Sequence, residues 1–382
     1  MIIHGGRIHD GNGCIYESDI QIKDGKITKI AEKINDEDEI IDASGKEIFP
    51  GFIQTLSFWG INGSMSEIRP SSQDNDELSN PITPELDVRY AFNGHAASTQ
   101  QLGAFGLTTV GVTPTDNNLF GGTMAVYEVD GINPFKMCLK PYAGMKASVS
   151  EKVKNSYKAK MAPQTKMWMF EQLKEQLRLA NEYKKDDVPE RNMKLEAIQR
   201  VLTGELPLFI SCDNVQDIAH VKEIVEPYSN IKLVLCNGFG ISDKDSWIND
   251  QKTSLVVRSS SMTMDDIAMT IDLKAIAKLS EEGMLIALSG VDSGFQIRED
   301  VLWLGIGMMK VMQDETKVLP MMTSIPAKLL GVYDQTGSIE EGKRADLVIW
   351  SANPLETYTA SIEATYMNGR VIYKKGDEMK CI

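Results

Sequence analysis

The chain has 382 residues, of which 42% are hydrophobic and 25% are charged, a composition typical of a folded globular protein. Its formal net charge of −14 opposes binding to phosphate backbones and to anionic lipid, so neither nucleic acid nor a membrane surface is an expected partner. The sequence shows no apolar run long enough to span a bilayer and no signal-peptide pattern at its N-terminus. Its five cysteines are scattered without a CxxC pair, which favours reduced thiols in a cytoplasmic protein.

Both ends of the chain are predicted to be rich in β-structure. Apolar and polar residues alternate with a period of two in short runs, and glycine-containing turns such as Lys23–Lys26 and Asn368–Gly369 separate some of them. The expected strands are Ile2–Ile3, Asp19–Ile22, Lys26–Ile30, Asp346–Trp350, Ile362–Met367 and Arg370–Tyr373. Strands at both termini predict one small sheet domain that is assembled from the two chain ends.

The middle of the chain alternates short apolar runs with amphipathic helices, for example Met169–Tyr183. Eight candidate strands in this region predict a closed (β/α)8 barrel, with an open doubly wound sheet as the alternative. No glycine-rich phosphate fingerprint follows the first strand, which weakens the open-sheet alternative. The candidate strands are Glu47–Phe58, Leu107–Val112, Met124–Val129, Lys136–Leu139, Pro207–Cys212, Lys232–Cys236, Ser254–Arg258 and Leu285–Ser289.

Three stretches resemble motifs of the amidohydrolase superfamily of metal-dependent hydrolases. Phe49–Ile53 resembles the family's PGFID entry into the first barrel strand, and Thr323–Gly331 resembles its T-x-x-PA-x-x-LG helix. Gly337–Val348 resembles its G-S-I-x-x-G-K-x-A-D-L-V return to the sheet domain. Within the superfamily, stretches such as Asn80–Leu86 and Gly121–Val126 look most like the imidazolonepropionase-like branch.

The resemblance implies an α/β fold with a TIM barrel and a small β-sandwich domain. The barrel domain is expected over residues 49–331, and the composite sandwich over residues 1–48 and 332–382. It also implies hydrolysis of carbon–nitrogen bonds other than peptide bonds. The family's zinc or other divalent metal generates hydroxide from bound water, and an aspartate moves the proton.

Several positions depart from the family's metal site. On the first barrel strand the family carries H-x-H, whose alternate histidines point to the same side. Here Leu56 and Phe58 stand at those positions, and neither side chain can ligate a metal. The chain has four histidines, His4, His9, His95 and His220, and none falls at the end of a predicted barrel strand. A dinuclear histidine site is therefore not expected.

The remaining site positions carry other residue types. Glu128 and Asp213 are the candidate metal ligands, since carboxylates can bind a divalent cation directly. Asn237 stands where the family has a histidine, and Lys146 matches a loop motif that faces the ligand, so both are predicted to bind a ligand. Gly290 replaces the proton-transferring aspartate, and Asp292 is the candidate catalytic substitute two residues later. The cofactor is predicted to be absent, or to be one zinc or manganese ion at an altered site.

Two functions remain open from the sequence. One is a carbon–nitrogen hydrolase with an altered metal site, impaired in standard metal-hydroxide chemistry. The other is a non-catalytic paralogue, a pseudoenzyme that binds a small-molecule ligand or serves as a partner subunit. In either case the chain is expected to form a homo-oligomer or to pair with a related subunit.

Overall fold

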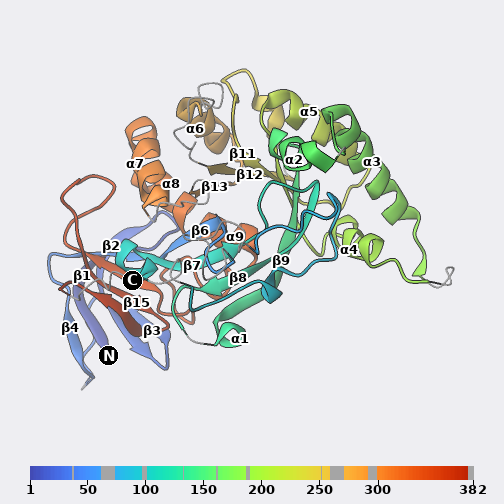
Figure 1. Ribbon diagram of the computed structural model, residues 1–382. Coiled ribbons are helices and arrows are strands. Elements are labelled where there is room, and N and C mark those ends of the chain that lie inside the picture. The colour runs from blue at the N-terminus through green and yellow to red at the C-terminus, as the bar shows by residue number, and fades with distance from the viewer. Residues whose placement is uncertain are drawn as a thin grey trace.

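Two eight-stranded sheets organise the chain in the computed structural model, which describes residues 1–36, 38–61, 74–96, 101–131, 133–160, 162–185, 190–250, 252–258, 271–290 and 299–376 (Figure 1). One sheet combines strands from both chain ends, and the other curls into the barrel. The prediction of a barrel with a separate terminal sheet is confirmed. Within the described residues, we find no helix that is both long and apolar enough to cross a membrane.

The terminal sheet joins the two ends of the chain through an antiparallel pair, in which Ile48 of β5 faces Ile349 of β14. Apolar residues from both chain ends form its core, among them Ile8 and Leu347. The Asp24–Gly25 and Asn368–Gly369 turns have positive φ angles at both central residues, the conformation that tight hairpins need. The sheet contains β1 (Ile2–His9), β2 (Ile15–Lys23), β3 (Lys26–Ala31), β4 (Ile40–Asp42), β5 (Glu47–Pro50), β14 (Leu347–Trp350), β15 (Ile362–Met367) and β16 (Arg370–Lys374).

The eight predicted barrel strands all occur, with shifted boundaries. The run Glu47–Phe58 divides at Gly51 into β5 of the terminal sheet and β6 of the barrel. The short run Lys136–Leu139 spans the end of a short helix and the first two residues of an eleven-residue strand, β9. The barrel strands are β6 (Phe52–Ser57), β7 (Leu107–Val112), β8 (Phe120–Glu128), β9 (Cys138–Ser148), β10 (Leu208–Ser211), β11 (Leu233–Asn237), β12 (Thr253–Arg258) and β13 (Ile286–Ser289).

The expectation of a wholly parallel barrel is wrong at one strand. β8 runs antiparallel to both β7 and β9, whereas the other neighbouring pairs of the barrel are parallel. The connections over residues 113–119 and 129–137 are too short for a crossover, which needs a dozen or more residues. The carboxyl end of β8 therefore lies at the end of the barrel where the neighbouring strands begin, opposite to the position that βα alternation predicts.

The remaining elements are helices. Side chains of α3 and α5 join a large hydrophobic core with outward-facing strand residues, while a second apolar cluster lies among inward-facing strand residues. The α-helices are α1 (Pro134–Met137), α2 (Glu151–Tyr157), α3 (Lys166–Glu182), α4 (Met193–Leu202), α5 (Val215–Val225), α6 (Leu273–Glu281), α7 (Asp300–Met312), α8 (Glu315–Val318) and α9 (Ser324–Leu330). The 3-10 helices cover Val88–Tyr90, Leu102–Phe105, Lys158–Lys160, Ser246–Ile248 and Leu319–Met322.

The barrel closes between its first and last strands through side chains. Leu56 N donates to Ser289 Oγ at 3.1 Å, and the same hydroxyl donates to Leu56 O at 3.3 Å. One residue earlier, Thr55 Oγ1 donates to Leu288 O at 3.3 Å. Two hydroxyl groups therefore satisfy backbone atoms where β6 meets β13, and they hold the ends of the sheet together.

Candidate functional site at the barrel end

Five polar side chains meet at the carboxyl end of the barrel, where barrel enzymes carry their active sites. We call them the barrel-end network: Asp116, Lys146, Ser211, Asn237 and Arg258. Asp116 follows β7, Lys146 lies near the end of β9, and the other three stand at the ends of β10, β11 and β12. Parallel strands bring these residues to one edge although up to 142 positions separate them in the sequence.

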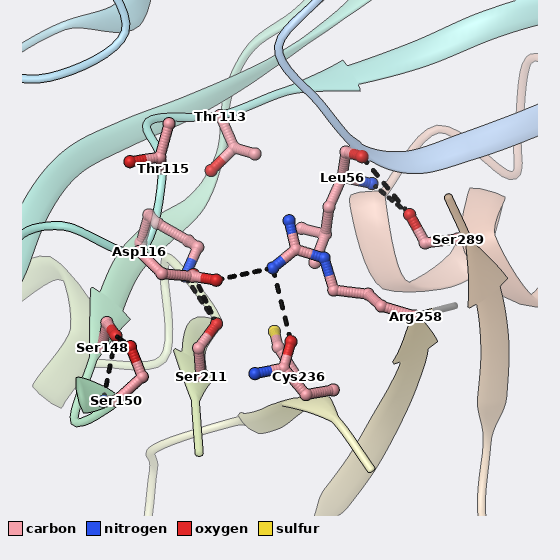
Figure 2. A network of polar contacts seen from close by, with 12 residues as sticks. Leu56, Thr113, Thr115, Asp116, Ser148, Ser150, Ser211, Cys236, Arg258 and Ser289 are labelled. Carbon is pink, nitrogen blue, oxygen red and sulfur yellow. Dashed lines mark hydrogen bonds and ion pairs between the residues drawn. The ribbon is translucent and has the colours of Figure 1, made fainter. Parts of the chain in front are cut away.

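Asp116 is the centre of the network. Its Oδ1 accepts hydrogen bonds from Lys146 Nζ and, at 2.6 Å, from Ser211 Oγ. Its Oδ2 accepts from Arg258 Nη1 at 2.8 Å. Lys146 Nζ also donates to Ser211 Oγ at 2.9 Å, so the lysine, the serine and the carboxylate bond to one another in a ring. Figure 2 shows Arg258 reaching from its strand across the barrel end to Asp116.

The three charged members of the network are removed from solvent. The exposed fractions of the Lys146, Asp116 and Arg258 side chains are 0%, 2% and 1%. A buried charge is tolerated only when it is paired and hydrogen-bonded, because desolvation costs several kcal/mol per ion. Asp116 thus offsets part of the cost of burying two cations at once. The burial of Lys146 and Arg258 therefore depends on this one carboxylate.

Asn237 and Lys146, the predicted ligand-binding residues, both belong to this network. The backbone of Asn237 is left-handed, with φ at 98°, and its side chain turns back toward the neighbouring strand. Its Nδ2 donates to Cys212 O at 3.2 Å, and its Oδ1 accepts from Arg258 Nη1 at 3.4 Å. The structure brings the two residues together, but each one is bonded to protein groups.

Leu56 and Phe58 lie at the barrel end on the side away from Asp116. Both side chains are buried, and the guanidinium carbon of Arg258 lies 6.0 Å from the centroid of the Phe58 ring. Leu56 also packs in the apolar cluster inside the barrel. Figure 2 places Leu56 and Ser289 on the far side of Arg258 from Asp116. Two apolar residues therefore occupy the positions where the family resemblance would place histidines.

Glu128 and Asp213, the predicted metal ligands, lie at opposite ends of the barrel. Because β8 is antiparallel, Glu128 pairs with Thr109 near the start of β7, while Asp213 follows the carboxyl end of β10. Glu128 stands six residues beyond Gly122, the β8 residue opposite Lys146. At ~3.3 Å per residue this is about 20 Å of strand. The two carboxylates cannot share one ion, so the predicted pair of ligands is corrected.

Each of these carboxylates already has a cation as its partner. Glu128 Oε1 lies 2.5 Å from Arg344 Nη2, and Asp213 Oδ2 lies 3.2 Å from Lys166 Nζ. Burial raises the pKa of both carboxyl groups, and the paired arginine and lysine oppose that rise. Asp213 also accepts from Glu151 N at 2.7 Å, which ties it to the start of α2. Both residues are thereby bound into local structure.

Side chains crowd the eighth-strand position where the family has its aspartate. A Cβ atom at Gly290 would lie 2.6 Å from Gln54 Nε2 and 3.2 Å from the Cβ atom of Asp300. Gln54 in turn donates to Leu56 O at 3.1 Å. Gln54 therefore fills the space where an aspartate side chain at position 290 would begin. Asp292, the predicted catalytic substitute, lies outside the described residues.

The described residues of the barrel end do not fit a divalent metal. Leu56 and Phe58 offer no lone pair, and two cationic heads approach the carboxylate of Asp116. A divalent cation there would meet repulsion from Lys146 and Arg258 in a region of low dielectric. Across the described ranges, no three histidine, cysteine, aspartate or glutamate side chains gather as metal ligands.

The two cysteines beside the network do not change this assessment. Cys212 and Cys236 are buried, and burial raises the pKa of both thiols, that of Cys236 to about 11. Metal binding and nucleophilic attack both require the thiolate. At neutral pH these two side chains therefore behave as small apolar groups.

The chemistry open to the network itself is limited. A serine nucleophile needs a neighbouring group that accepts its proton. Ser211 donates to Asp116, whose charged form is stabilised by Lys146 and Arg258. The arrangement favours a fixed ion network over an activated serine.

The sequence analysis missed Asp116, Ser211 and Arg258 as site residues. A signal was present for the two charged residues: Asp116 lies in the polar run Thr113–Asn118 directly after an apolar strand, and Arg258 ends an apolar strand with a charge. Polar residues directly after parallel strands converge at one edge of the sheet. That rule would have selected both, but it could not have paired them with Lys146.

Comparisons with known proteins support one family. A model of the amidohydrolase family matches residues 313–373. The crystal structure of an amidohydrolase from Thermotoga maritima aligns with a TM-score of 0.88 and 27% identity, covering 98% of this chain and 100% of that one. A guanine deaminase from E. coli aligns with a TM-score of 0.53 and 17% identity over 98% of this chain and 99% of that one, which shows the fold alone.

A curated human relative covers less of the chain. Dihydropyrimidinase-related protein 5 from Homo sapiens is 30% identical over 103 residues, which make up 22% of this chain and 18% of that protein. The match thus spans about a fifth of the relative's length. The full-length alignment with the Thermotoga maritima amidohydrolase, the family match near the C-terminus and the barrel with its terminal sheet agree: the chain belongs to the amidohydrolase superfamily.

Proposed function

We propose that this protein is a non-catalytic member of the amidohydrolase superfamily that binds a small polar molecule at the carboxyl end of its barrel. The observation that carries the proposal is the convergence of Lys146 and Arg258 on the buried carboxylate of Asp116. Metal-hydroxide chemistry needs a cation held by neutral or anionic ligands at this end of the barrel. Here the side chains of Lys146 and Arg258 supply the positive charge at this end of the barrel.

The substitutions around the network support the same proposal. Leu56 and Phe58 remove the first-strand ligands, and Gly290 removes the proton carrier. A single substitution could be compensated by a neighbouring residue. Loss of the metal ligands and of the acid–base group together removes both the source of hydroxide and the means to move its proton.

The proposed ligand is small and polar because of the kind of groups at the barrel end. Arg258 and Asn237 carry N–H groups, and Lys146 adds a positive charge, while the hydroxyl groups of Ser148 and Ser150 lie 2.8 Å apart. Polar groups of both kinds orient ligands in barrel sites. We further propose descent from the imidazolonepropionase-like branch, on the basis of stretches such as Gly121–Val126.

Metal content and hydrolysis together test the absence of catalysis. The purified protein is assayed for bound metals, before and after incubation with zinc or manganese followed by dialysis. It is then assayed with cyclic imides, amides and amidines. We expect far less than one metal per chain and no hydrolysis above the blank. One metal per chain, with hydrolysis that a chelator abolishes, would establish the alternative of an altered metal-dependent hydrolase.

Ligand binding is tested separately by calorimetry with a panel of small carboxylic acids, amides and ureas. We expect at least one compound to bind the wild type and to bind K146M much more weakly. The matched control is K154M, which removes a partly exposed lysine paired with Glu151 at 3.0 Å. Equal loss of binding in both variants, or binding to neither the wild type nor the variants, contradicts a site at the barrel end.

A further inference from the structure

A fully buried histidine connects the terminal sheet to the barrel. His9 is the last residue of β1, and its side chain is 0% exposed. Its Nε2 lies 2.6 Å from Glu47 Oε2 of β5, and its Nδ1 contacts Glu315 Oε1 of α8. We call His9, Glu47, Glu315 and Asn353 the His9 junction. Glu315 stands on the barrel side of this junction, whereas His9 and Glu47 belong to the terminal sheet.

The geometry of the junction decides the protonation of the ring. A neutral imidazole has one N–H group and one lone pair, so one of its nitrogens would turn a lone pair toward a carboxylate. Both nitrogens of His9 face carboxylate oxygens. Between two charged carboxylates, only the doubly protonated ring can interact favourably with both. The ring also stacks on Phe49, with centroids 4.1 Å apart, which fixes its orientation.

The other groups around His9 hold the two carboxylates in place. Asn353 Nδ2 donates to Glu315 Oε2 at 2.6 Å, and Arg7 Nη1 lies 4.0 Å from Glu47 Oε1. The charged groups that face the ring from β1, β5 and α8 are thus Arg7, Glu47 and Glu315. Two cations then balance two carboxylates, and loss of the His9 proton would leave the carboxylates with one.

We propose that His9 is a buried imidazolium that clamps the terminal sheet to the barrel, and that the clamp loosens when His9 loses its proton. The junction is then a pH-sensitive device built into the fold. In the protonated state, the ring bridges two elements far apart in the sequence. In the neutral state, one of the two contacts between the ring and a carboxylate becomes repulsive. The attraction that holds β1 to β5 and α8 is then weakened.

The direction of the pH effect follows from the environment of the ring. Burial opposes the charge, but the close contacts with the Glu315 and Glu47 carboxylates outweigh it, so the pKa of His9 is raised above its ordinary value of 6.5. A raised pKa in the folded state contributes stability that is fully present below pH 6.5 and is lost as the pH rises through the folded-state pKa. The window of the effect therefore lies on the alkaline side of 6.5.

The first test compares urea unfolding of wild type and H9Q across the range from neutral to alkaline pH. We expect the advantage of the wild type to shrink as the pH rises, by about tenfold in the folding equilibrium constant for each unit of pKa difference. H4Q is the matched control, because His4 pairs with Asp19 at 2.9 Å but its side chain is 48% exposed. A wild-type advantage over H9Q that stays constant with pH would overturn the proposal.

The second test does not depend on H9Q folding. The 15N resonances of the four imidazole rings are recorded in the full chain and assigned with H4Q, H95Q and H220Q. We expect His9 to show two protonated nitrogens at neutral pH. Hydrogen exchange, corrected for the intrinsic pH dependence, should then increase in β1 and α8 once this ring titrates, and should remain unchanged in β10. A neutral His9 ring at pH 7 would overturn the proposal.

Discussion

Arg258 Nη1 and Asp116 Oδ2 lie 2.8 Å apart, buried where the carboxyl ends of β12 and β7 face each other across the barrel. This contact joins two of the strand ends that surround a barrel active site. The barrel end should therefore contribute to the stability of the fold, and this contribution can be measured.

Asp116→Ala should destabilise the protein strongly. The substitution leaves Lys146 and Arg258 buried without the carboxylate that they share, and breaking a buried ion pair typically costs about 3–5 kcal/mol. Urea unfolding followed by circular dichroism measures the change. Glu175→Ala is the control, since Glu175 pairs with Arg178 at the surface, where solvent screening leaves little effect on stability. Equal small effects in both variants would show that the network does not stabilise the barrel.

Ser289→Ala should weaken closure of the barrel. The hydroxyl group serves both Leu56 N and Leu56 O, and leaving buried backbone groups unsatisfied costs about 1–3 kcal/mol. We expect a lower unfolding midpoint and faster hydrogen exchange in β6 and β13. Ser229→Ala, at an exposed serine, should leave both measurements unchanged. Unchanged exchange in β6 would contradict a closing role for Ser289.

Installing the family's histidines should not restore a metal site. In the double variant L56H/F58H the imidazole at position 58 would lie near Arg258, and the charges of Arg258 and of Lys146 beyond it oppose a divalent cation. Metal analysis after incubation with zinc and dialysis should find far less than one zinc per chain, as in the wild type. Circular dichroism checks that the variant is folded. One retained zinc per chain would show that the cations are no obstacle.

Thiol reactivity should separate the cysteines by burial. Cys14 is exposed, whereas Cys212 and Cys236 are buried, and the pKa of Cys236 is raised to about 11. In a C14S/C381S background, a disulfide reagent at pH 8 should modify Cys212 and Cys236 only after denaturant is added, because the thiolate is the reactive form. The same background with Cys14 restored is the control and should react rapidly. Fast labelling of Cys236 in the native protein would contradict its placement.

Predictions from local sequence were strongest where short-range patterns decide the structure. The alternation in Lys26–Ile30, the Asn368–Gly369 turn and the helix Met169–Tyr183 all appear in the structure within a few residues. The absence of lone pairs at Leu56 and Phe58 is likewise a property of the residue types alone. Periodicity and side-chain chemistry act over a few residues, so the sequence by itself determined them.

The candidate site depended on contacts that no local pattern specifies. Glu128 looked like a metal ligand as long as its strand was taken as parallel, but the antiparallel course of β8 carries it to the opposite end of the barrel. Lys146 was selected as a ligand-binding candidate, but its partner Asp116 lies 30 positions away in the sequence, and Arg258, which shares that carboxylate, lies 112 positions away. Strand direction and long-range pairing arise from chain closure and from the desolvation of charges in three dimensions, so only the tertiary structure decided them.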